Sequence, residues 1–196
     1  MKKYFIFMVV IATIVLFSSC AKVPQAELDA AKASLEQAKA AQADVYLDSE
    51  YMALQDSLNA ANTIIETQKS KMFGNFKVAK EKLVYVSAQA TDLASKAEAK
   101  KEEIKNEVSA TLTDISTVME ENNKLVGIAP KGKEGKEAIE AIKSDLAAIS
   151  TSVEEVNTLL AGNEILAAQT KANAAKQKAT DINNELKKVM EKYARK

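Results

Sequence analysis

Histidine is absent from this chain of 196 residues, and cysteine occurs once, at Cys20. Structural zinc, haem and iron–sulfur centres use imidazole or several thiolate ligands, so none of them can be assembled from this sequence. A single cysteine also excludes a disulfide within one chain. We therefore expect no metal site and no cofactor.

Glycine, proline and aromatic residues are scarce: there are five glycines and two prolines, and aromatics make up 5%. Tight turns are therefore few, and the alternation of β-branched and aromatic residues that marks strands is missing. Hydrophobic residues nonetheless make up 47% of the chain, and many of them are alanines that suit narrow helical seams. This composition predicts an all-α fold, an elongated antiparallel helical bundle of coiled-coil hairpins with about five helices.

Charge of one sign is not in excess, because 27 basic residues balance 27 acidic ones. Without residues 1–19, which include Lys2 and Lys3, 25 basic residues remain against 27 acidic ones, a net charge of −2. A nucleic-acid-binding protein needs a clustered basic excess to neutralise phosphates. We therefore expect no nucleic-acid partner.

Residues 1–19 have the three parts of a secretory signal peptide. Two lysines follow Met1, residues 4–17 are apolar except for one threonine, and two serines complete the segment. A membrane-spanning helix usually needs about 20 apolar residues, so this stretch is short for a permanent anchor. We predict a cleaved signal peptide over residues 1–19, with an uncleaved anchor as the alternative.

Cys20 follows this segment directly, and a short link with Pro24 follows the cysteine. The sequence LFSSC resembles the lipobox of bacterial lipoproteins. In a lipobox the cysteine sulfur receives a lipid, the chain is cut just before the cysteine, and the new amino terminus is acylated in turn. The resemblance implies lipid attachment at Cys20 with a lipidated tether over residues 20–24, whereas the alternative is an incidental thiol. Two or three acyl chains, typically palmitate, hold a protein on a bilayer far better than one.

The residue after the cysteine bears on location. Ala21 stands where, in enteric lipoproteins, an aspartate signals retention at the inner membrane. The resemblance therefore implies a lipid anchor in the outer membrane of a bacterial cell envelope, facing the periplasm or the cell surface.

Apolar residues every three or four positions predict three helices over residues 25–126, beginning near Pro24. The first predicted face consists of Leu28, Ala31, Leu35, Ala38 and Val45. The second helix is predicted to be capped by Asp48 or Ser49; its face consists of Tyr51, Leu54, Leu58, Ala61, Ile65 and Met72. The third is very long, with Lys101 at one seam position; its face consists of Ala79, Leu83, Val86, Ala90, Leu93, Ala97, Ile104, Val108, Ile115 and Met119.

Three of the five glycines and Pro130 lie in residues 127–135, which predicts a loop. A helical hairpin is predicted over residues 136–196, with an elbow at Gly162-Asn163. Its first seam consists of Ile139, Ile142, Leu146, Ile149, Val153, Val156 and Leu160. Its second consists of Ile165, Ala168, Ala172, Ala175, Ala179, Ile182, Leu186, Val189 and Tyr193.

Weak internal similarity suggests a duplicated hairpin. The sequence ALQDSLNA at residues 53–60 aligns with AIKSDLAA at 141–148, and the same offset places Gly74-Asn75 on Gly162-Asn163. One residue further, ATDL at 90–93 matches ATDI at 179–182. The alternative is chance agreement between alanine-rich heptads.

No pattern of catalytic residues stands out. The segment from Gly127 to Glu134 approaches the phosphate-binding pattern G-x-x-x-x-G-K-[ST], but Glu134 replaces the hydroxyl that would hold magnesium, and the lead-in is helical. Adjacent acids occur at Glu102-Glu103, Glu120-Glu121 and Glu154-Glu155, and neighbours on a helix point about 100° apart rather than into one cleft. We expect no enzymatic activity.

Two further resemblances concern the envelope. The last six residues, EKYARK, are similar to the end of Braun's lipoprotein, a lipid-anchored helical rod joined to peptidoglycan through its terminal lysine, which implies a candidate attachment site at Lys196. A basic last turn that suits the helix dipole is the alternative. Over residues 20 to about 110, the cysteine, the proline, ELDAAK and EQAKAAQADVY resemble a family of bacterial lipid-anchored helical envelope proteins of unknown function.

Two functions remain open. In the first, the chain is a structural or tethering lipoprotein whose helical coiled-coil rod reaches another envelope component, either peptidoglycan or a protein. In the second, it is a lipid-anchored binding module or accessory subunit whose seams receive a partner helix or an apolar ligand. The seams also allow two copies of the chain to associate. Because alanine seams leave little pocket volume, the first function is favoured.

Overall fold

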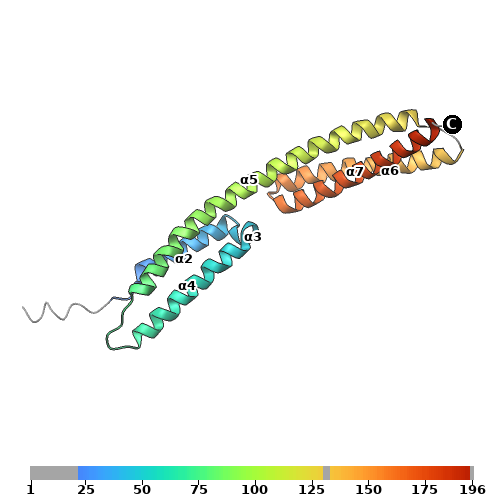
Figure 1. The fold of residues 1–196 in the computed structure, drawn as a ribbon. Helices are drawn as coiled ribbons and strands as arrows, with labels where there is room; N and C mark the ends of the chain where they lie inside the picture. The colour runs from blue at the N-terminus through green and yellow to red at the C-terminus, as the bar shows by residue number, and fades with distance from the viewer. Residues whose placement is uncertain (1–21, 130–132, 195–196) are drawn as a thin grey trace, which may run out of the picture. The chain divides into compact units, whose positions relative to one another are not determined.

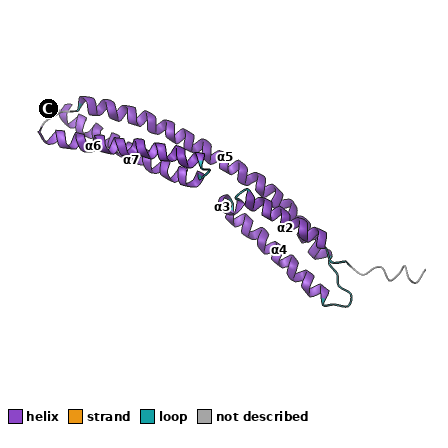
Figure 2. Ribbon diagram, turned by 180° about the vertical axis from the view of Figure 1, so that it is seen from behind, coloured by secondary structure: helices purple, strands orange, loops and turns teal. Residues whose placement is uncertain are grey.

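The structure, a computed structural model, describes residues 22–129 and 133–194. Within these ranges the fold is all-α, as predicted, and Figures 1 and 2 show its six helices. They are α2 (Gln25–Ala40), α3 (Ala43–Tyr46), α4 (Asp48–Lys69), α5 (Lys77–Ile128), α6 (Lys133–Ala161) and α7 (Ile165–Ala194). The chain divides into two compact units, unit 1 up to Ala99 and unit 2 from Lys100, so that α5 contributes to both.

Unit 1 is a bundle of α2, α4 and the first part of α5. Lys80 pairs with Glu27 at 2.7 Å, and the hydroxyls of Ser34 and Ser87 are 2.9 Å apart, so α2 and α5 run in the same direction. In Figure 1, α4 runs back in the opposite direction. The core contains apolar side chains from all three helices: Leu28, Ala31, Leu35, Ala38, Tyr51, Leu54, Ala61, Ile65, Ala79, Leu83, Val86, Ala90, Leu93 and Ala97.

The turn between α2 and α4 changes the helical phase. Gln42 adopts the left-handed conformation, with φ of 64°, and the single turn α3 follows it. A right-handed helix cannot continue through a residue in this conformation, so the apolar face of α2 does not extend past Gln42. The prediction of Val45 as a core residue was therefore wrong: its side chain is 51% exposed, and Ala43 is buried instead.

The ends of α4 also differ from the prediction. Leu47 precedes the helix, and no side chain forms a capping hydrogen bond there, so neither Asp48 nor Ser49 is the cap. Asp48 stands in the first turn, where the helix dipole favours a negative charge. At the other end α4 stops at Lys69, and Met72, predicted on its face, lies beyond the helix and is 91% exposed.

The elbow between α4 and α5, residues 70–76, is shaped by Gly74 and Asn75. The Asn75 side chain accepts a hydrogen bond from the Lys77 N–H at 3.0 Å and so caps the start of α5. A Cβ on Gly74 would lie 2.4 Å from the carbonyl oxygen of Gln68, a close approach that only glycine allows.

Two glycine substitutions are therefore expected to have opposite effects. Gly74→Ala forces the elbow backbone apart and should lower the free energy of unfolding by about 1–3 kcal/mol. Gly127, predicted in a loop, lies in α5 with open space around its Cβ position, so Gly127→Ala should raise stability by about 0.5 kcal/mol through helix propensity. Thermal unfolding followed by circular dichroism checks both, and a stabilised Gly74→Ala variant would contradict the close approach.

Unit 2 is a bundle of the rest of α5 with α6 and α7. Asp114 pairs with Lys176 and Glu121 with Lys187, so α5 and α7 run in the same direction. Lys171 pairs with Glu155 and Lys178 with Asp145, an order that makes α6 and α7 antiparallel. The largest core side chains include Ile115, Leu146, Ile149, Ile182 and Leu186.

The predicted elbow of unit 2 is present at Gly162-Asn163. Asn163 adopts the left-handed conformation, with φ of 59°. The Glu164 N–H bonds the Leu159 carbonyl at 2.9 Å and the Asn163 N–H bonds the Leu160 carbonyl at 3.1 Å, the paired bonds of a Schellman motif. These bonds satisfy the last carbonyls of α6 before α7 begins.

The segment 127–135 is more helical than predicted, because α5 continues through Gly127 and Ile128 and α6 begins at Lys133. Two seam predictions near the end of α7 were wrong, since Val189 and Tyr193 are exposed. Lys101, predicted at a seam position, is buried there.

The buried positions of the two units share one register. Phe76 and Ile165 are 89 residues apart, and the next six buried apolar positions after each repeat the same offset. They are Ala79, Leu83, Val86, Ala90, Leu93 and Ala97 in unit 1, and Ala168, Ala172, Ala175, Ala179, Ile182 and Leu186 in unit 2. Each unit is also a bundle of three helices in the same order. This correspondence supports the predicted duplication.

Candidate functional site

The two predicted attachment residues, Cys20 and Lys196, lie outside the described residues. The part of the chain nearest to Cys20 that the structure describes is the start of unit 1. Over residues 22–129 and 133–194, no helix is both long enough and apolar enough to cross a membrane.

The chain enters unit 1 at Val23, earlier than the predicted tether of residues 20–24 implies. Val23 is half-buried against the core of unit 1. Its carbonyl accepts the Gln25 N–H at 2.8 Å, and the Pro24 carbonyl accepts the Leu28 N–H at 3.0 Å. Proline suits this position because its missing N–H would have no helical partner. Within the described residues, packed structure is therefore present from Val23, three positions after Cys20 in the sequence.

The start of α2 lies beside the start of α5. Residues 22–24 and Glu27 line a shallow pocket together with residues 75–77 and Lys80. Lys80 donates a hydrogen bond to Glu27, which holds the pKa of that carboxyl below its usual value. This pair stabilises the end of the bundle above that lowered pKa, and the contribution is lost as the pH falls through it.

Sequence reasoning missed an exposed apolar pair at the same end of unit 1. Met72 is 91% exposed and Phe73 is 90% exposed, the two highest values among large hydrophobic residues of the described ranges. Both lie in the elbow that leads to Asn75 and Phe76. The only feature of the sequence that pointed to this segment was the adjacent Gly74-Asn75. That pair indicates a turn and does not indicate which side chains are exposed.

A buried polar pair lies in the core of unit 2. Asn122 is fully buried, its side-chain N–H donates to the Ala179 carbonyl at 2.9 Å, and its side-chain oxygen accepts a hydrogen bond from Asn183 at 2.9 Å. Ser34 and Ser87 form a smaller polar contact between α2 and α5 of unit 1. Such contacts fix the register of neighbouring helices, because shifting one helix would leave buried polar groups without partners.

A charged pair flanks these asparagines at the surface. Lys187 lies 3.0 Å from Glu121 and donates to it, which holds the pKa of Glu121 below its usual value. A hydrogen bond from Asn183 lowers that pKa further. The pair therefore stabilises unit 2 at neutral pH and loses this effect as the pH falls through the lowered pKa.

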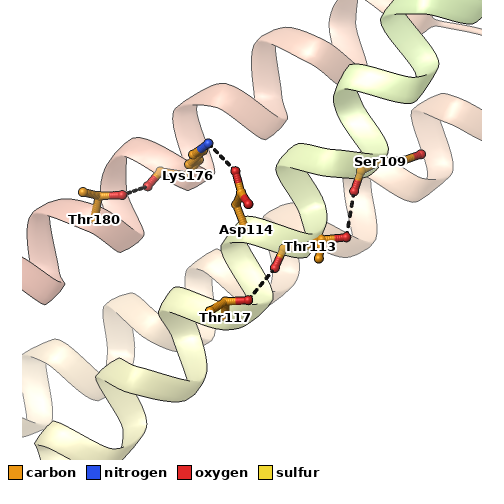
Figure 3. A network of polar contacts seen from close by, with 6 residues as sticks. All are labelled: Ser109, Thr113, Asp114, Thr117, Lys176 and Thr180. Atoms are coloured by element: carbon orange, nitrogen blue, oxygen red, sulfur yellow. Dashed lines mark hydrogen bonds and ion pairs between the residues drawn. The ribbon is translucent and has the colours of Figure 1, made fainter.

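Several hydroxyl groups of unit 2 donate hydrogen bonds to backbone carbonyls of their own helices. In Figure 3, Thr113 donates to the Ser109 carbonyl, Thr117 to the Thr113 carbonyl and Thr180 to the Lys176 carbonyl. Lys176 itself pairs with Asp114 across to α5. A catalytic hydroxyl needs an adjacent base that is itself oriented by a third group. The hydroxyls of Thr113, Thr117 and Thr180 donate to backbone carbonyls instead.

The adjacent acids Glu102 and Glu103 pair with different lysines. Glu102 pairs with Lys105 and Glu103 with Lys100, so the two carboxylates turn to different partners. Among the residues that the structure describes, no group of three or more metal-ligating side chains is found. The segment that approaches a phosphate-binding loop is preceded by helix α5, whereas that function needs a strand before the loop.

Comparison with known proteins finds no matching family model, no similar curated protein and no similar solved structure.

Proposed function

We propose that this protein is a structural or tethering lipoprotein of the bacterial cell envelope. Acyl chains on Cys20 hold it in a membrane, by resemblance the outer membrane, and its helical units reach another envelope component. The observation that carries the proposal is the position of Cys20, between an apolar segment and a folded unit that begins three residues later.

The length of this connection supports an anchoring role. Three residues span at most about 11 Å when fully extended. An acylated Cys20 lies at the surface of the hydrocarbon layer, so the first end of unit 1 is held beside the lipid headgroups. A long flexible linker would separate the helices from the membrane, whereas this link keeps the helices at its surface.

The packing of the seams supports a tether more than a carrier of apolar ligands. Alanines such as Ala31, Ala90 and Ala179 are fully buried, and they bring the helices close together. The seams are thereby filled by the chain's own side chains. A surface groove of about 430 Å³ beside α2 and α5 is lined by residues such as Ala30, Leu83 and Thr91.

Intact-mass measurement of the protein extracted from membranes tests the proposal. We expect a chain that begins at Cys20 and carries the additional mass of two or three acyl chains. A mass equal to the unmodified chain from Met1 would contradict lipid attachment and would favour an uncleaved anchor.

Partners at the other end of the tether are tested by digestion of peptidoglycan. Attachment through Lys196 predicts a muropeptide linked to the peptide of residues 181–196 after cleavage before Asp181, and its absence from the digest would remove this site. Chemical cross-linking in intact cells then identifies a protein partner of the helical units.

A further inference from the structure

The elbow of unit 1 combines exposed apolar side chains with a run of positive charge. Residues 67–80 contain four lysines and no acid: Lys69, Lys71, Lys77 and Lys80. Three of them pair with acids outside this range: Lys69 with Glu66, Lys77 with Glu81 and Lys80 with Glu27. Met72 and Phe73 stand in the middle of this run, each about nine-tenths exposed. An aromatic and a thioether side chain surrounded by lysines form the pattern of segments that enter the headgroup region of anionic membranes.

The elbow lies at the end of unit 1 from which the chain leads back to Cys20. Lys22 and Val23 line the same pocket as Asn75 and Phe76, the last two residues of the elbow. Figure 1 shows the start of α2 beside the start of α5, with the elbow leading into α5 at this end of unit 1. An anchor on Cys20 would therefore hold this end of unit 1 against the bilayer.

The internal duplication provides a comparison within the same chain. At the offset of 88 residues that relates the two Gly-Asn elbows, residues 67–80 correspond to residues 155–168 of unit 2. That segment contains two acids, Glu155 and Glu164, and no lysine, and Ala161 occupies the position of Phe73. The basic and apolar character is therefore a property of the elbow of unit 1 and not of such elbows in general.

We propose that the elbow formed by residues 70–76, with Met72 and Phe73 at its centre, is a second membrane contact that inserts into the headgroup region of an anionic bilayer. This inference deepens the proposed lipid anchoring and depends on it for the position of the membrane. Lys71, within the elbow, faces the lipid phosphates, and the two apolar side chains enter the boundary of the acyl region. The contact would orient unit 1 on the membrane, which a single attachment point cannot do.

Tryptophan fluorescence tests the contact, because the natural chain has no tryptophan. The full protein is purified from membranes as Phe73→Trp and reconstituted into vesicles of phosphatidylethanolamine and phosphatidylglycerol that carry bromine on their acyl chains. Ala161→Trp, at the equivalent position of the other elbow, is the matched control. Because side chains of interfacial segments lie about 5–10 Å into the headgroup and acyl boundary, bromine should quench roughly half of the emission of Trp at position 73 and little of that at position 161.

Three outcomes would overturn the inference. Equal quenching at the two positions would show no preference for this elbow. Emission from position 73 that is shifted to shorter wavelength without bromine quenching would show burial by a protein partner or a second copy. Unchanged quenching after Lys71→Glu, or in vesicles of phosphatidylcholine alone, would contradict recognition of anionic lipid.

The same samples distinguish failure of this inference from failure of the anchor. Their intact mass reports whether Cys20 carries lipid, whereas quenching reports only the position of the elbow. Quenching at position 73 in a chain without lipid would support the elbow contact and contradict the proposed lipoprotein. A lipidated chain without quenching at position 73 would support the proposed lipoprotein and contradict the elbow contact. Circular dichroism of Phe73→Trp should match the natural protein, since the replaced side chain is exposed.

Discussion

Replacing Cys20 with alanine should abolish incorporation of a fatty-acid analogue into the protein. The sulfur that would carry the lipid is then gone, and no other cysteine can substitute for it. Since each buried methylene contributes about 0.8 kcal/mol to membrane binding, loss of two or three acyl chains removes almost all of the proposed anchoring energy. Metabolic labelling followed by gel electrophoresis measures the effect.

Membrane release needs a second variant, because Cys20→Ala can keep the apolar segment of residues 4–17 attached. A chain that begins at Ala21 and follows an ordinary signal peptide with an A-x-A cleavage site should appear in the soluble fraction after export. Ser18→Ala, which keeps a small residue before the cysteine, should label like the natural protein and serves as the control. Labelling of Cys20→Ala at the natural level would contradict the anchoring model.

The second large effect is expected in the core of unit 2. Asn122→Leu removes the acceptor for the Asn183 side chain and the donor to the Ala179 carbonyl. Since Asn183 is itself buried, its hydrogen bond to position 122 is lost without replacement by water, and we expect a loss of about 1–3 kcal/mol in the free energy of unfolding. Urea unfolding followed by circular dichroism measures this loss.

A double-mutant cycle separates the hydrogen bond from the change in shape. Replacing both Asn122 and Asn183 with leucine removes both polar groups, so the double variant should be more stable than the sum of the two single losses predicts. Ser34→Ala, at the equivalent register position of unit 1, should cost less because that contact is smaller and nearer to solvent. Additive losses in the Asn122 and Asn183 cycle would contradict a coupled pair.

Helix faces could be read from the sequence wherever one helix continues and packs along its length. The seam from Ala79 to Val108 was predicted position by position because α5 is unbroken there. The same spacing failed at Val45 and Met72, where it was extended past the end of a helix. Predicting a buried face from apolar spacing assumes that the helix continues without interruption. The residue types do not indicate that Gln42 is left-handed or that α4 ends at Lys69.

Polar residues that lie in the core were harder to recognise. Asn122 and Asn183 sit at seam spacing, but asparagine is normally exposed, so the pattern alone assigns it to the surface. Their partnership joins positions 61 residues apart and is visible only once α5 and α7 are placed side by side. The candidate lipid site was predicted instead from the residues on either side of Cys20 in the sequence. That prediction does not depend on how the helices pack.

Because the chain enters unit 1 at Val23, the elbow can contribute to membrane binding even if its own affinity for lipid is low. A short linker turns the binding of a second site into an intramolecular event, with an effective concentration in the millimolar range. With Cys20 anchored, an elbow whose own affinity for lipid is only about millimolar would therefore be bound about half of the time. The same elbow on a free chain would be bound to membranes hardly at all.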